Sequence, residues 1–196
     1  MKLFLMLLFI IFLKNIQCDI KELSSHEFFN MLTTGKNYKK KNQNLNNILD
    51  FKSINDLQEN AHIKTTKDFV LYVYAKWDND SNNLIAVFRE VERIIKEKNL
   101  KLDFYIFNIE NAKDLCNALN ITSLPLILYI SSGHKKKKNS LFQRIFSSSK
   151  DVKINNAFRY NGDLYCYDYI VEWIEIHYHF AKTVLLMKNI FKKKKK

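Results

Sequence analysis

Residues 69–77 read Phe69-Val70-Leu71-Tyr72-Val73-Tyr74-Ala75-Lys76-Trp77, a nearly unbroken run of apolar and aromatic side chains. Such a run is typical of a central strand that is covered on both faces of its sheet. A second landmark, Thr122-Ser123-Leu124-Pro125-Leu126-Ile127, contains the only proline of the chain. Because proline has no backbone N–H to donate to a sheet, we expect a strand to begin just after Pro125.

The sequence around these landmarks predicts alternating strands and helices. Leu84 to Lys98 carries apolar residues at three-four spacing, which is typical of an amphipathic helix packed on a sheet. Asp168 to about Ile190 predicts a longer helix of the same kind. Further strands are expected at 102–109, 126–130 and 157–160, and a shorter helix at 111–119. This order indicates an α/β domain.

The strand that ends in an aromatic residue, Ala75, any residue and Trp77, followed at position 125 by proline, resembles the thioredoxin family. The segments 160–163 (Tyr-Asn-Gly-Asp) and 169–174 are similar to the closing strand and last helix of protein disulfide isomerase domains. The resemblance covers roughly residues 48–180. It implies a thioredoxin-like fold, in which helices flank a central mixed sheet, and a cis peptide bond before Pro125.

The family's Trp-Cys-x-x-Cys motif is replaced here by Trp77-Asp78-Asn79-Asp80-Ser81. In redox-active relatives the first cysteine lies at a helix N-terminus, where the helix dipole stabilises its thiolate. Asp78 is instead expected to cap that helix. Ser81 cannot resolve a mixed disulfide, and Tyr72 stands where relatives keep a buried acid. We therefore interpret residues 77–81 as a vestigial active-site turn and expect no enzymatic oxidoreductase activity.

The resemblance also implies a peptide-binding edge at Leu124 and Pro125. In redox-active relatives this loop pairs an extended peptide with exposed backbone N–H and C=O groups, which needs no sulfur. Keeping the loop without the thiols is what a redox-inactive, chaperone-like module that binds extended polypeptide or a protein partner would do. A merely structural domain would keep it as well, because the same bend shapes the sheet edge, and both interpretations remain open.

The first residues predict entry into the secretory pathway. Met1-Lys2 and the apolar run from Leu3 to Leu13 are typical of a signal peptide, which we expect at 1–18. The run is too short to span a bilayer, although an uncleaved anchor remains an alternative. The endoplasmic reticulum lumen and secretion both remain open as final locations.

Residues 19–47 are predicted as an N-terminal extension and residues 48–181 as the thioredoxin-like domain. Two segments compete for the first strand and helix of this domain. They are Asp19–Leu23 with a helix capped by Ser24, and Ile48–Phe51 with a helix capped by Ser53. The interval from Ser53 to Trp77 is close to that of the family, so the later segment is the prediction.

The formal net charge of +12 is concentrated in two lysine runs, Lys135–Lys138 and Lys192–Lys196. The first lies in a basic loop insertion predicted at 134–155, and the second ends a basic helical tail predicted at 182–196. Nucleic acid is not an expected partner, because a nucleic-acid protein would spread its basic residues over a folded face. The alternative function is a structural scaffold subunit of a secreted or membrane-surface complex that docks through the basic loop and tail, with Lys192–Lys196 contacting an anionic membrane.

The two cysteines after the signal peptide, Cys116 and Cys166, are expected on different elements. The resemblance gives no precedent for pairing them, so they are predicted to be buried free thiols. We expect neither a metal nor another cofactor, because His177 and His179, two positions apart on a helix, point to different sides and no further ligand completes a set.

Two sequons make Asn79 and Asn120 candidate glycosylation sites. The first sequon lies in the vestigial turn, so a glycan on Asn79 would obstruct access to the peptide-binding edge.

Overall fold

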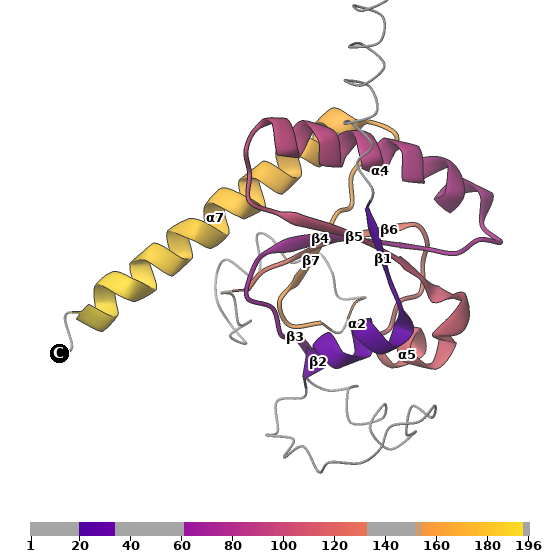
Figure 1. The fold of residues 1–196 in the computed structure, drawn as a ribbon, viewed down its shortest axis with the longest axis horizontal. Coiled ribbons are helices and arrows are strands. Elements are labelled where there is room, and N and C mark those ends of the chain that lie inside the picture. Colours follow the sequence, from indigo (N-terminus) through magenta and orange to yellow (C-terminus); the bar gives the residue numbers. More distant parts are fainter. Residues whose placement is uncertain (1–19, 34–60, 133–151, 153, 194–196) are drawn as a thin grey trace, which may run out of the picture.

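The strand predicted from the first landmark, β4 (Phe69–Tyr74), is the centre of a five-stranded sheet in the computed structural model of the chain. The structure describes residues 20–33, 61–132, 152 and 154–193. The strand order is β1-β5-β4-β6-β7 (Figure 1). The other strands are β1 (Lys21–Leu23), β5 (Asp103–Asn108), β6 (Leu126–Ile130) and β7 (Ala157–Arg159). The predicted signal peptide and residues 194–196 of the lysine run lie outside the described residues.

The sheet is mixed because β4 runs parallel to β5 and antiparallel to β6. Val73 lies opposite Phe107 on one side and Leu126 on the other. β1 extends the sheet in parallel beyond β5, and β7 extends it in antiparallel fashion beyond β6. All six residues of β4 are buried, as expected of a central strand.

Helices cover both faces of this sheet (Figure 1). The helices are α2 (Ser25–Met31), α4 (Asn79–Glu97), α5 (Lys113–Ala118) and α7 (Tyr167–Lys193), with a 3-10 turn η1 (Ile109–Asn111). Phe69, Leu71 and Val73 pack with α2 and α5, whereas Val70, Tyr72 and Tyr74 pack with α4 and α7. The alternation follows from the two-residue period of a strand and confirms the predicted thioredoxin-like α/β fold.

The first strand and helix of the domain lie earlier than predicted. Pairing of β1 with β5 places Leu23 opposite Phe107, and Phe28 of α2 packs on the Phe107 ring with the ring centroids 4.6 Å apart. Ser24 caps α2, because its hydroxyl accepts a hydrogen bond from the backbone N–H of Glu27 at 3.2 Å. The Glu27 carboxylate in turn accepts one from the backbone N–H of Ser24 at 2.9 Å.

The prediction that the domain starts at residue 48 is therefore wrong, since β1 and α2 belong to the sheet and its core. The family-like interval between Ser53 and Trp77 is a weaker guide here than the local pattern Ser24-x-x-Glu27, which is a capping box. The later candidate strand at 48–51 and the helix from Ser53 lie outside the described residues.

The end of the predicted basic loop belongs to the core. Residues 133–151 lie outside the described residues, but Val152 and Ile154 are buried. Ile154 also forms a parallel bridge with Ala61. The prediction of a basic loop through residue 155 is therefore wrong for these last positions, whose apolar side chains join the α2 and α5 side of the sheet.

The buried side chain of Asn156 joins three backbone segments. Its Oδ1 accepts a hydrogen bond from the N–H of Ile63 at 3.0 Å. Its Nδ2 donates to the carbonyl of Ile63 at 2.9 Å and to the carbonyl of Ser131 at 2.8 Å. Asn156 thus ties the end of β6 to β3 (His62–Ile63), which pairs with β2 (Leu32–Thr33) in a small ribbon.

α4 buries one residue that the sequence pattern places on its polar side. Glu92 is only 3% exposed, and its Oε1 lies 2.7 Å from the Nζ of Lys96. Its Oε2 has no hydrogen-bond partner among the described residues. α7 packs alongside α4 and adds an ion pair of 2.7 Å between Lys98 and Glu175. The sheet therefore covers the apolar face of α4, and α7 covers a second side of the same helix.

The last helix confirms the prediction for 168–190 and extends it to Tyr167–Lys193. Its first half buries Ile170, Ile174 and Tyr178 against the sheet. Its second half projects beyond the body of the domain (Figure 1). The predicted tail boundary at residue 182 is not the end of an element, because the helix continues through it.

Candidate functional site

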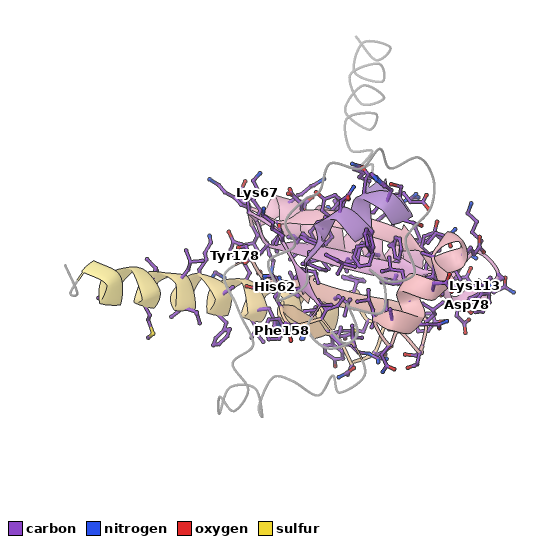
Figure 2. The ribbon with its side chains drawn as sticks, turned by 90° about the horizontal axis from the view of Figure 1, so that it is seen from below. His62, Lys67, Asp78, Lys113, Phe158 and Tyr178 are labelled. Atoms are coloured by element: carbon purple, nitrogen blue, oxygen red, sulfur yellow. The ribbon has the colours of Figure 1, made fainter. Side chains whose placement is uncertain are left out.

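Three loops meet at one end of the sheet because of the directions of its strands. β6 is antiparallel to β4, so the start of β6 lies beside the end of β4, and the end of β7 lies there as well. The loops are the vestigial turn 77–81, the segment 122–125 and the segment 161–166. Figure 2 shows Asp78, in the first of these loops, at the end of the domain away from the free end of α7.

The vestigial turn is closed by its own hydrogen bonds. Asp78 is the N-cap of α4, as predicted, and its Oδ2 accepts hydrogen bonds from the backbone N–H and the hydroxyl of Ser81. The Nδ2 of Asn82 donates to the carbonyl of Lys76 at 2.7 Å. Ser81 is fully buried, whereas Asn79 and Asp80 are exposed. The two positions that carry cysteines in the family's motif thus bond to each other.

Tyr72 lies beneath this turn, where the resemblance predicts a replacement for a buried acid. Its hydroxyl donates a hydrogen bond of 2.6 Å to the carbonyl of Ser81, and its ring stacks on Phe88. Burial, together with the nearby Asp78 carboxylate and the Tyr165 phenol, raises the pKa of Tyr72 well above its usual value. The phenol therefore stays protonated at neutral pH and is a hydrogen-bond donor to the turn.

The indole of Trp77 is 67% exposed, but its backbone is held from the neighbouring strand. The backbone N–H of Trp77 donates to Oε1 of Glu110 at 3.2 Å. Glu110 is positioned in turn by Asn108, whose Oδ1 accepts from the Glu110 N–H at 3.1 Å and whose Nδ2 donates to Oε2 at 3.2 Å. Sequence reasoning missed Glu110; the Asn-x-Glu pattern at the end of β5 signals the local turn but not its contact with Trp77.

The second loop presents free backbone beside the turn. The peptide bond between Leu124 and Pro125 is cis, as predicted, and both residues are half-buried. Among the described residues, neither the N–H nor the carbonyl of Leu124 has a hydrogen-bond partner. The pairing of Val73 with Leu126 places Leu124 next to the chain that leads from β4 to Trp77. The structure thus brings together the predicted turn and the predicted edge.

The third loop adds an aromatic side chain that sequence reasoning missed. Tyr165 is exposed, and its backbone N–H donates to Oδ1 of Asp163 at 2.9 Å. The Tyr160 hydroxyl donates to the carbonyl of Asp163 at 3.0 Å, and a Cβ at Gly162 would overlap the Tyr160 ring. Because β6 lies between β4 and β7 in the sheet, the segment that carries Leu124 lies between the vestigial turn and this loop.

Both described cysteines are free, as predicted, but only one of them is fully buried. Cys116 lies on α5 in the core, and burial raises the pKa of its thiol to about 12. Cys166 is half-buried, which differs from the prediction, because it lies in the third loop at the surface end of the domain. Neither thiol belongs to the vestigial turn.

The sequons differ in accessibility. Asn79 is exposed at the first residue of α4, whereas Asn120 is half-buried and has a positive φ of 58°.

His177 is buried with its Nδ1 at 2.8 Å from the carbonyl of Trp173, and His179 is exposed. The described part of the chain contains no group of three or more histidine, cysteine or acidic side chains placed to hold a metal ion.

No protein-family model matches the chain, and no curated protein matches it. Among solved structures, it is similar to the J-Trx1 fragment of ERdj5 at 17% identity and a TM-score of 0.43, covering 59% of this chain and 43% of that one. The zinc-bound form of human ERp44 is similar at 16% identity and a TM-score of 0.43, covering 66% of this chain and 31% of that one. Chloroplastic thioredoxin z is similar at 20% identity and a TM-score of 0.35, covering 56% of this chain and 80% of that one. The chain thus spans less than half the length of the first two.

The geometry of the chain itself defines its class. The chain has a thioredoxin-like fold. Its features are the mixed sheet with β4 at the centre, the helices on both faces and the cis peptide bond before Pro125. The resemblance aligns the four positions of the vestigial turn from Asp78 to Ser81 with Cys-x-x-Cys.

Proposed function

We propose that this chain is a redox-inactive, thioredoxin-like protein of the secretory pathway that binds extended polypeptide at Leu124 and Pro125. The observation that carries the proposal is the unpaired backbone of Leu124, in a segment that lies between the two loops that carry the exposed residues Trp77 and Tyr165. An extended peptide gains main-chain hydrogen bonds by pairing with such an edge, as in other strand-addition complexes.

The two aromatic side chains give this edge its affinity for apolar segments. Trp77 and Tyr165 are large and exposed, and aromatic residues of this kind are common anchors in protein interfaces. The backbone N–H of Trp77 donates to Glu110 and that of Tyr165 donates to Asp163, so the backbone of both aromatic residues is held in place. A preorganised pair of anchors reduces the entropy that a bound peptide must overcome.

The proposed function is binding and not catalysis. Asp78 and Ser81 bond to each other at the turn, and the protonated phenol of Tyr72 lies beneath them. A thiolate that attacks a disulfide and a base that takes its proton are the groups that an oxidoreductase needs at this position. The proposal for the secretory pathway rests on the signal-peptide pattern of the first residues.

Hydrogen exchange tests the strand-addition mode directly. The amide of Leu124 should exchange rapidly in the free protein and become protected when a reduced, alkylated and therefore unfolded client is added. Client binding, measured by fluorescence anisotropy, should weaken about tenfold in Trp77→Ala, because a buried anchor contributes more than 1 kcal/mol. Pro125→Ala should also weaken it by altering the loop.

Leu186→Ala is the matched control, since Leu186 is also a large exposed apolar side chain but lies in the distal half of α7. This variant should bind the client like the unmodified chain. Unchanged client binding by both Trp77→Ala and Pro125→Ala, with no protection at Leu124, would reject the peptide-binding edge and favour the scaffold function.

A further inference from the structure

The distal half of α7 carries a row of apolar side chains that the domain does not cover. Leu186, Met187 and Ile190, here called the apolar stripe, are each more than half exposed. At 3.6 residues per turn, the three positions fall within an arc of about 100°. The stripe therefore forms one continuous face of the helix.

This face points away from the domain. The buried residues of α7 lie on the opposite side of the helix by the same spacing. They include Ile170, Ile174, Tyr178 and Ala181. Beyond Ala181 the helix leaves the body of the domain (Figure 1), so its outer face has no covering element among the described residues.

The charge of this region has a single sign. From Ile176 to the last residue the sequence contains seven lysines and neither aspartate nor glutamate. The lysines are Lys182, Lys188 and Lys192–Lys196. The Nζ of Lys182 lies 4.1 Å from the ring centroid of buried Tyr178, so this cation is on the domain side and not within the stripe.

A helix with an apolar face and uncompensated lysines is typical of a segment that lies in the interface of an anionic bilayer. The apolar side chains enter the boundary between headgroups and acyl chains, and each lysine near the surface adds attraction to anionic lipid. None of the described helices is long and apolar enough to cross a membrane, so an in-plane orientation is the one that fits α7.

We propose that the distal half of α7 binds the surface of an anionic lipid bilayer through the apolar stripe and its lysines. A second copy of the chain is disfavoured as the occupant. A parallel pair of α7 helices would bring two sets of seven lysines together with no acidic side chain to compensate them. The inference goes beyond the proposed function and uses other residues, so each can fail alone.

Vesicle flotation of the full chain tests this. Phosphatidylcholine vesicles with about one third phosphatidylserine should bind the protein, pure phosphatidylcholine vesicles should bind it far less, and salt should weaken the binding. Leu186→Asp should reduce the affinity at least tenfold. Leu185→Asp is the matched control, because it makes the same charge change at an exposed position, 44% exposed, that lies off the stripe. It should reduce the affinity no more than about threefold.

Deletion of Lys192–Lys196 should lower binding to the anionic vesicles and leave client binding unchanged. Equal losses in the two aspartate variants, or equal binding to anionic and neutral vesicles, would overturn the proposal. Sedimentation of the chain as a dimer that Leu186→Asp makes monomeric, without vesicle binding, would overturn it in favour of a second copy.

Discussion

The phenol of Tyr72 and the backbone of Ser81 are joined by a hydrogen bond of 2.6 Å that links the central strand to the turn above it. Tyr72 comes from the middle of β4 and Ser81 from the first turn of α4, and both are fully buried. The hydrogen bond therefore ties the first turn of α4 to the central strand inside the core.

Tyr72→Phe should lower the free energy of unfolding by about 1 kcal/mol without changing the fold, because it removes this buried hydrogen bond. Urea unfolding followed by circular dichroism measures the loss. Tyr105→Phe is the matched control, since the Tyr105 hydroxyl has no hydrogen bond to any described residue. A loss as large in the control would show that the Tyr72 bond contributes nothing of its own.

Asp78→Ala should destabilise the protein by about 1 kcal/mol, because it removes the cap of α4 and the partner of the Ser81 hydroxyl. Asp78→Asn keeps an acceptor at the cap and should remain within about 0.5 kcal/mol of the unmodified chain. Asp80→Ala makes the same charge change at an exposed position and should cost less than Asp78→Ala. Thermal melts of the three variants separate the cap from the charge, and equal costs for the two alanine variants would contradict the cap.

Alkaline pH should destabilise the fold through Cys116. Its pKa is about 12 in the folded state, above the usual value that applies in the unfolded chain, so the unfolded chain loses the proton first. Below the usual pKa of a thiol, Cys116 does not change the free energy of unfolding with pH. Above it, the free energy of unfolding falls by about 1.4 kcal/mol per pH unit until the folded pKa is reached. Cys116→Val should flatten this part of the pH profile of urea unfolding. Leu115→Ala, a neighbouring core change without a titrating group, should lower stability at every pH and keep the slope.

Insulin reduction and refolding of scrambled ribonuclease should proceed no faster with this protein than with buffer. The turn has no thiol, and the two described thiols lie on α5 and in the third loop. Cys166→Ser should therefore leave the background rate unchanged. Clear turnover that this substitution abolishes would establish an oxidoreductase that works outside the usual motif.

Asn156→Ala should cost about 2–3 kcal/mol, because it leaves buried backbone groups of Ile63 and Ser131 without partners. Asn155→Ala is the control at the adjacent position. The backbone N–H of Asn155 donates to the carbonyl of Ala61 at 2.8 Å, and this bond survives the substitution. Chemical denaturation of both variants measures the difference, and similar costs would argue against a clamp by Asn156.

The centre of the fold could be predicted from the sequence because its signals are local. An apolar run defines β4, proline marks the start of β6, and three-four spacing outlines α4 and α7. The start of the domain could not be predicted from spacing to Trp77, although the capping box of Ser24 and Glu27 was a local signal for it. The burial of Glu92 depends on α7 packing beside α4. The spacing of apolar residues within α4 does not predict that packing.

The site was predictable only in part, for the same reason. Asp78, Ser81, Leu124 and Pro125 belong to short patterns that resemble known motifs. Glu110 bonds to Trp77, 33 positions away along the chain, and Asn156 bonds to Ile63, 93 positions away. No local sequence pattern predicts contacts over such intervals. Only the folded sheet brings these partners within hydrogen-bond distance.

The continuity of α7 sets a fixed separation within the molecule. This helix starts directly after the loop that carries Tyr165 and ends in the lysine run, and its 27 residues measure about 40 Å from end to end. A continuous helix, and not a flexible linker, therefore joins the loop that carries Tyr165 to the far end of α7. The two ends of the helix stay about 40 Å apart along its axis.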